Sequence, residues 1–259
     1  MAWARFPYPD QRFHYSAAGL KEAWRGLHAG DAEPWPRGAA LVEAWIAFHA
    51  GDFEQAAKKG LALGLPGHAV ANKASCMQAV YLDRSADTKC ERLQEVIRRC
   101  ELQQAQQPEK AAAFYWHAYA LGRYAQEISV VQALAQGIGG KVRASLDATL
   151  ALAPRHADAH IALGVYHAEI IDKIGAVIAR LSYGASRADA IAHFKKALSL
   201  NPASAIARVE YARALSMLDG RGADAEAAAL RREAADAEPH DAMERLDIER
   251  ARQELAAQA

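Results

Sequence analysis

Strand-forming patterns are nearly absent from this sequence. Runs in which Val, Ile, Thr or aromatic residues alternate with polar residues between turn signals do not occur. Glycine and proline are also sparse, with 17 and 9 residues out of 259, and they lie mostly at segment ends. The hydrophobic share is 52%, much of it alanine, which loses no side-chain entropy in a helix. The sequence therefore predicts an all-α fold.

An excess of charge of either sign is lacking. Lys plus Arg and Asp plus Glu total 31 each, so the formal net charge is zero. Such a chain has neither the basic footprint of a nucleic-acid-binding protein nor a polybasic segment for a membrane surface. No apolar run reaches the roughly 18 residues that a transmembrane helix requires. We therefore expect no nucleic-acid partner and no membrane span.

A signal peptide is not visible either. The N-terminal residues contain no apolar core before Pro7 and Pro9. We expect a cytoplasmic protein. The periplasm is the alternative if a signal peptide has been removed.

Cysteine is rare, and catalytic motifs are missing. Cys76, Cys90 and Cys100 show no CxxC spacing, which argues against a disulfide framework and a zinc site and favours ordinary buried thiols. No Ser-His-Asp order, carboxylate pair or Cys-His dyad occurs in a motif context. We predict a protein that is not an enzyme, with no catalytic residues and no cofactor.

One complete repeat pattern is present between residues 160 and 202. It reads His160-x2-Leu163-Gly164-x2-His167, then Ala190-x3-Phe194, then Pro202. This resembles the tetratricopeptide (TPR) spacing W-x2-L-G-x2-Y … A-x3-F … P, with histidine at both aromatic positions. The position of closest helix approach in that repeat is occupied by a small residue in three successive units: Ala120, Gly164 and Ala212.

The resemblance implies a right-handed solenoid of about five TPR-like helical hairpins with long inserts. Prolines that stop helices recur in phase with them, at Pro66, Pro108, Pro154, Pro202 and Pro239. We divide the chain into an N-terminal segment and helix (1–37), a TPR-like array (38–239) and a C-terminal capping helix (240–259). The capping helix would cover the last apolar face of the array.

The third and fourth hairpins carry apolar insertions between their two helices. Gly164 and Pro202 lie 38 residues apart, against roughly 24 in the minimal repeat. The apolar insert residues are Val130, Val131, Leu134, Ile174, Val177, Ile178 and Leu181. They could pack on each other, contact a second copy in a homodimer, or line a cavity for an apolar ligand.

An array with such an insert is similar to two groups of proteins. One is the regulator-of-microtubule-dynamics-like bacterial TPR proteins. The other is the T component associated with TRAP transporters, a periplasmic TPR protein. The resemblance covers roughly residues 114–218. For the transporter-associated group it implies binding of a small ligand or a partner protein outside the cytoplasm.

A dense aromatic cluster lies at the start of the third hairpin. Trp116 and Tyr119 occupy repeat positions and are expected to pack in the core, while Tyr115 and Arg123 should point elsewhere on the helix. We name all four as candidates for contact with a partner in the concave groove.

Histidines also cluster, at His156, His160 and His167. Paired histidines on one helical face can bind Zn²⁺, but two of these three occupy the aromatic positions of the repeat. We interpret them as packing residues and predict no metal site.

Together these features favour a non-enzymatic TPR scaffold that mediates protein–protein interaction through its concave groove. The partner would be a protein or peptide whose identity the sequence does not give. The alternative is a transport-associated binding protein for a small apolar ligand, held in a cavity that the two inserts line.

Overall fold

The computed structural model of the chain describes residues 2–257, except for the side chain of Arg221. Within these residues it contains fourteen α-helices and no strand. The expected fold class, an all-α array of helical hairpins, is confirmed. The described residues form two compact units. Residues 1, 258 and 259, at the ends of the predicted N-terminal segment and capping helix, lie outside the description.

The first unit comprises residues 2–28, Glu33–Pro154 and His240–Met243. Three of its helix pairs are hairpins of the expected kind: α2 with α3, α4 with α5, and α6 with α8. The bounds of its helices are α1 Ala17–Leu27, α2 Ala39–His49, α3 Phe53–Ala62, α4 His68–Met77, α5 Ala86–Gln106, α6 Ala111–Glu127, α7 Val130–Ala135 and α8 Ile138–Leu152.

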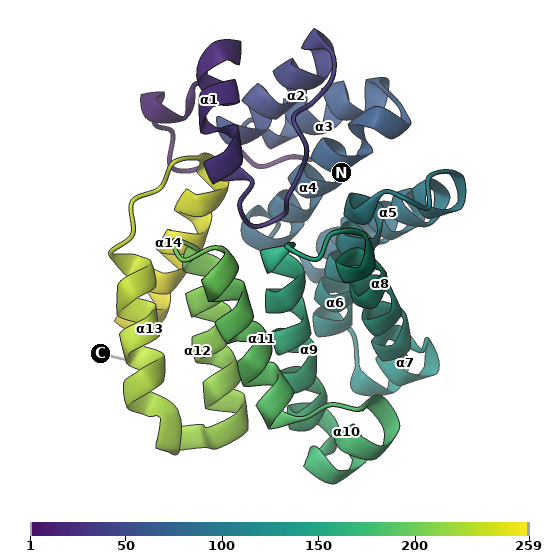
Figure 1. Ribbon diagram of the computed structural model, residues 1–259, viewed down its shortest axis with the longest axis vertical. Coiled ribbons are helices and arrows are strands. Elements are labelled where there is room, and N and C mark those ends of the chain that lie inside the picture. The colour runs from purple at the N-terminus through teal and green to yellow at the C-terminus, as the bar shows by residue number, and fades with distance from the viewer. Residues whose placement is uncertain (1, 258–259) are drawn as a thin grey trace. The chain divides into compact units, whose positions relative to one another are not determined.

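Among the described residues, the second unit comprises Ala29–Ala32, Arg155–Pro239 and 244–257. Helices α9, α11 and α12 lie side by side, and α13 pairs with α12 (Figure 1). The helix bounds are α9 Ala157–Ile174, α10 Ala176–Tyr183, α11 Arg187–Leu200, α12 Ala205–Asp219, α13 Asp224–Ala235 and α14 Ala242–Ala256.

Short polar residues set the helix starts, as their capping preference predicts. The side chains of Ser16, Asp52, Ser186 and Ser204 each accept a hydrogen bond from a backbone N–H in the first turn of α1, α3, α11 and α12. Gly51 supplies the reversal between α2 and α3 with a φ of +87°, which is open to glycine and strained for other residues.

Close packing of α9 on α11 depends on Gly164. A Cβ atom at this position would lie 2.6 Å from the Phe194 ring, so only glycine lets the two helices approach this closely. Ala120 and Ala212, the matching positions of the neighbouring hairpins, are fully buried. The contact at Gly164 and the full burial of Ala120 and Ala212 agree with the interpretation that helices approach closely at these three positions.

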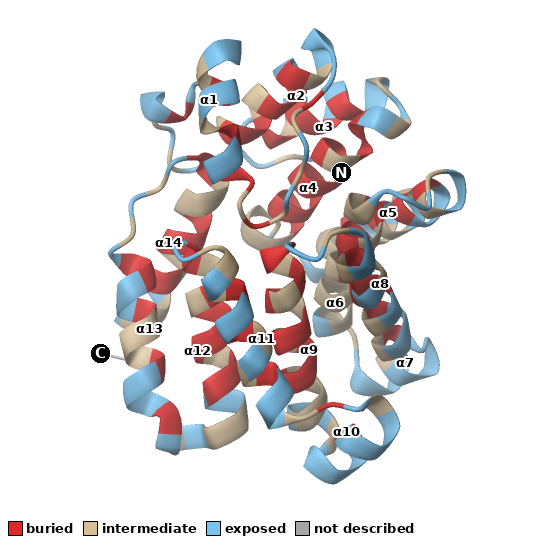
Figure 2. Ribbon diagram, viewed as in Figure 1, coloured by how far each residue is buried: buried red, intermediate tan, exposed pale blue. Residues whose placement is uncertain are grey.

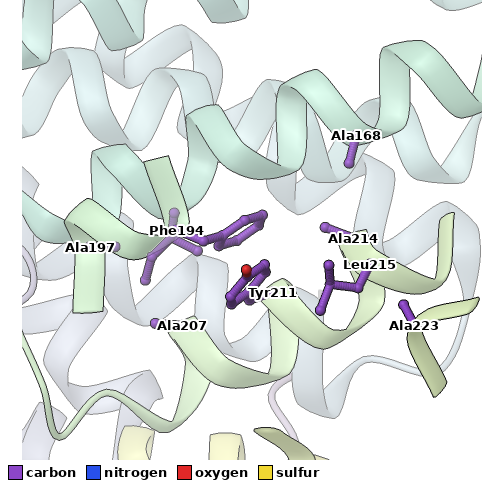
Figure 3. Packing of buried hydrophobic residues seen from close by; sticks show 9 residues of the cluster. Ala168, Phe194, Ala197, Ala207, Tyr211, Ala214, Leu215 and Ala223 are labelled. Carbon is purple, nitrogen blue, oxygen red and sulfur yellow. The ribbon is translucent and has the colours of Figure 1, made fainter. Parts of the chain in front are cut away.

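The core of the second unit combines two stacked rings with many alanines (Figure 3). The ring of Phe194 lies parallel to that of Tyr211, with centroids 5.0 Å apart and an interplanar angle of 13°. Alanines from α9, α11 and α12 belong to the same cluster: Ala168, Ala197, Ala207 and Ala214. Small side chains bring the helix backbones together, and the rings fill the remaining space.

Candidate interaction surfaces

The structure separates the four groove candidates on α6 into two pairs. Tyr115 and Trp116 are buried, 5% and 4% exposed, whereas Tyr119 and Arg123 are half-buried. The guanidinium carbon of Arg123 lies 5.2 Å from the centroid of the Tyr119 ring. Tyr119 and Arg123 thus form a cation–π pair that keeps part of its surface in solvent.

The expectation that Tyr115 points away from the core is not met. Helix α6 packs against both α5 and α8, so side chains on most of its circumference meet a neighbouring helix. The ring centroids of Tyr115 and Trp116 lie 4.9 Å apart, and those of Trp116 and Tyr119 lie 5.4 Å apart. Burial gives Tyr115 and Trp116 a packing role and argues against direct contact with a partner.

A polar cluster between α4 and α5 was not anticipated from the sequence. Arg99 donates from Nε to Asn72 Oδ1 at 2.8 Å and from Nη2 to Ser75 Oγ at 3.0 Å. Both acceptors are neutral, and burial lowers the pKa of Arg99. Asn72 in turn contacts Cys100 Sγ at 3.3 Å through Nδ2. These hydrogen bonds connect α4 to α5 across the interior of the hairpin.

The thiols are held in the same region of the fold. Cys76 and Cys100 are fully buried, and Cys90 is half-buried. Burial raises the pKa of Cys76 to about 12 and that of Cys100 well above its ordinary value. All three cysteines are free thiols, and Cys76 and Cys100 agree with the interpretation as ordinary buried residues, whereas Cys90 keeps part of its surface in solvent.

The two insertions form the short helices α7 and α10, whose residues are mostly exposed (Figure 2). Helix α7 buries none of its residues, and α10 buries only Ala179. Six of the seven insert candidates are exposed: Val130 40%, Val131 76%, Leu134 48%, Val177 73%, Ile178 57% and Leu181 83%. Ile174, at the end of α9, is half-buried. A cavity lined by these residues stays a prediction.

The histidines of the second unit make specific contacts within it. His156 is buried and its Nδ1 accepts from the backbone N–H of Ala159 at 3.1 Å, which caps α9. His160 Nδ1 lies 2.9 Å from Nδ1 of His193 on α11, and the His193 ring stacks on His167 with centroids 5.7 Å apart. Burial, and then the neighbouring His193 and Lys196, lower the pKa of His160 to about 4. His193 belongs to this cluster although the repeat pattern gave no sign of it.

Neither a metal centre nor a membrane helix emerges from the part of the chain that the structure describes. Residues 2–257 hold no group of three or more His, Cys, Asp or Glu side chains suited to a metal ion. None of the helices described is both long enough and apolar enough to cross a bilayer.

The segment before α1 is the largest feature that sequence reasoning missed. Residues 2–10 have no regular secondary structure, bend at Pro7 and Tyr8, and lead into a short 3₁₀ turn at Gln11–Phe13. Arg92 of α5 donates from Nη2 to the Ala2 carbonyl at 2.9 Å, and its guanidinium carbon lies 4.3 Å from the centroid of the Trp3 ring. Phe6 lies over Gly51, in edge contact with Phe53 at a centroid distance of 6.2 Å. The signal in the sequence was the Trp3-x2-Phe6-Pro7 pattern, since Pro7 and Pro9 exclude a helix there.

The fold has a counterpart among solved structures. No protein-family model matches the chain, and no curated protein matches it. The crystal structure of a thermophilic TPR protein in Thermus thermophilus is similar in fold, with a TM-score of 0.57 at 15% sequence identity. The match covers 83% of this chain and 97% of that one. The chain therefore has a TPR-like fold.

Proposed function

We propose that this protein is a non-enzymatic scaffold that binds a segment of another protein, and that Tyr119 and Arg123 of α6 form part of the contact surface. The observation that carries the proposal is the Tyr119–Arg123 pair, which is half-exposed on the first helix of a TPR-like hairpin. Tyrosine and arginine are enriched where protein interfaces concentrate their binding energy, because each combines a large apolar area with directed hydrogen bonding.

Site-specific photo-crosslinking in the native host tests this proposal. A benzoylphenylalanine placed at position 119 should give a protein adduct that mass spectrometry identifies. The matched control places the same probe at Arg143, a half-buried residue of α8 that pairs with Asp147. Arg123→Ala should reduce the yield at position 119. No adduct at 119, or the same adduct from 143, would contradict the proposal.

The alternative of an apolar-ligand cavity between the inserts has no observation in its favour. The exposed fractions of its candidate lining residues on α7 and α10 run from 40% for Val130 to 83% for Leu181. A small apolar ligand is normally enclosed over most of its surface, so these exposed fractions give the alternative no support.

A further inference from the structure

A second surface of the first unit already holds a peptide segment without regular secondary structure, supplied by the chain itself. The surface lies where two successive hairpins turn. Gly51 stands between α2 and α3, and Phe53 is the first residue of α3. Asp83 precedes α5, and Arg92 lies in the second turn of α5. We call these four residues the turn edge. Residues 2–8 lie against it, with Trp3 on Arg92 and Phe6 on Gly51.

The polar half of the turn edge is preorganised. Arg92 is 2% exposed and donates from Nε to Asp83 Oδ2 at 2.8 Å, while Gln78 Nε2 donates to Asp83 Oδ1 at 2.7 Å. Asp83 thereby fixes the guanidinium plane and neutralises its charge. The Ala2 carbonyl and the Trp3 ring then bind to a group whose orientation is set by other residues.

The apolar half is a slot shaped for one aromatic ring. Gly51 forms its floor, since a Cβ atom there would lie 2.6 Å from the Phe6 ring. Phe53 and Phe13 form its sides, with ring centroids 6.2 and 6.5 Å from that of Phe6. Phe53 and Phe13 are themselves buried, so the slot belongs to the core of the unit.

The occupant, by contrast, is weakly attached. The backbone of residues 2–7 makes a single hydrogen bond to the rest of the described chain, the one from Arg92 to the Ala2 carbonyl. Trp3 and Phe6 are half-buried, and Ala2, Ala4, Arg5 and Pro7 are exposed. A segment held by few contacts opens locally at a small free-energy cost. Phe13, fully buried, and Tyr15, whose hydroxyl donates to the His240 carbonyl at 2.8 Å, hold the chain in place beyond the segment.

Proline makes the segment a ready ligand. Pro7 and Pro9 restrict the backbone conformations of the residues before them, Phe6 and Tyr8, and the chain bends at Pro7 and Tyr8. This restriction lowers the conformational entropy that is lost when the segment docks. Docking relies on one carbonyl and two rings, so a different chain of the same chemistry would fit equally well.

We propose that the turn edge is a recognition surface for a non-helical segment of a partner protein that carries two aromatic residues three positions apart, followed by proline, and that residues 2–8 occupy it in cis. The occupying segment acts as a competitor at millimolar effective concentration. A partner therefore binds in full only when the segment is released. This surface is distinct from the Tyr119–Arg123 pair on α6.

A fluorescein-labelled synthetic peptide of residues 2–9, titrated into the full chain, tests the proposal by anisotropy. Trp3→Ala combined with Phe6→Ala in the full chain should empty the turn edge and raise the affinity for the peptide about tenfold or more over the wild type. Arg5→Ala, at an exposed position of the same segment, is the matched control and should behave as the wild type. A peptide that carries both alanines should not bind.

Three results would overturn the proposal. The first is a folded double variant, judged by circular dichroism, that binds no more tightly than the wild type. The second is equal binding of the doubly substituted peptide. The third is a wild-type dimer, seen by light scattering and lost in the double variant, because the occupant would then be a second copy. Tyr119→Ala should leave peptide binding unchanged, so this proposal and the one for α6 can fail separately.

A second measurement uses the wild-type chain and does not depend on the folding of a variant. Trypsin cleavage after Arg5 should be several-fold faster with excess peptide in which Arg5 is replaced by alanine, since the peptide displaces the segment. The same peptide with Trp3 and Phe6 also replaced should have no effect. An unchanged cleavage rate with the first peptide, at concentrations that saturate the wild-type chain in the anisotropy titration, would overturn the proposal.

Discussion

The imidazole rings of His160 and His193 face each other across α9 and α11, with their Nδ1 atoms 2.9 Å apart. At this distance one nitrogen donates and the other accepts, which requires at least one ring to be neutral. Burial is the largest cause that lowers the pKa of His160 to about 4, from 6.5, and His193 and Lys196 add to it. His160 is therefore uncharged at neutral pH, which allows this hydrogen bond to form.

We expect the second unit to lose stability in mild acid. The unfolded chain binds a proton at His160 near pH 6.5, whereas the folded chain resists it down to about pH 4, so the free energy of unfolding falls as the pH drops through this window. Because His160 is only partly buried, solvent screening reduces the loss to about 1–2 kcal/mol.

Urea unfolding at pH 7.5, 5.5 and 4.5 measures this loss. His160→Gln should flatten the pH dependence between pH 6.5 and 4. An equal decline in the variant and the wild type would show that other groups are responsible.

Gly164→Ala should destabilise the chain by about 1–3 kcal/mol. The added Cβ would lie 2.6 Å from the Phe194 ring, and the cost of moving a buried ring outweighs the gain in helix propensity. Gly122→Ala in α6 is the matched control, because a Cβ there meets nothing within 4 Å. That variant should be neutral or about 0.5–1 kcal/mol more stable. Thermal unfolding of both variants measures the difference, and similar changes in Tm for the two variants would contradict the prediction.

We expect the cysteines to react unequally with a thiol reagent such as DTNB. At pH 8 a thiol whose pKa is about 12, as for Cys76, is ionised in about one molecule in ten thousand, and burial also blocks the reagent. Cys90 is half-buried, so it should react slowly as the single accessible thiol. Three thiols should react in denaturant. Native reactivity that persists in Cys90→Ser would show that Cys76 or Cys100 becomes exposed.

Polar substitution in α10 should leave stability nearly unchanged. Ile178 is 57% exposed, so Ile178→Asp removes little buried apolar area, and we expect a shift within about 0.5 kcal/mol. Ala179→Asp, the neighbouring control, places an unpaired charge at a fully buried position and should cost about 3 kcal/mol or more. A large loss in Ile178→Asp would indicate that the side chain is covered. Light scattering of Ile178→Asp also tests whether α10 mediates self-association. If it does, an oligomer of the wild type should be lost in this variant.

Local chemistry was enough to predict the helices and their pairing. Prolines after α8, α11 and α13 stop those helices, and the serines and aspartates before α1, α3, α11 and α12 begin others. Gly164 and the spacing of Ala190 and Phe194 fix how one hairpin closes. Helix caps, helix stops and repeat positions act within a few residues of one another or recur at fixed intervals. They can therefore be recognised in the sequence without knowledge of the tertiary structure.

The candidate surfaces were less predictable. Tyr115 is buried because α6 meets a neighbour on two sides, which the periodicity of one helix does not reveal. The apolar residues of α7 and α10 suggested burial by their composition, yet they face solvent because each short helix packs through small residues or hardly at all. His193 and Arg99 acquire their roles from partners 33 and 27 residues away in the chain.

What the sequence by itself determined is thus an all-α chain of TPR-like hairpins, because caps, helix stops and small-residue positions act locally. Only the tertiary structure decided which side chains remain accessible and that residues 2–8 rest on the turn edge. Those outcomes depend on which surfaces the folded helices leave uncovered, and on Arg92 and Gly51 meeting Trp3 and Phe6 from distant parts of the chain.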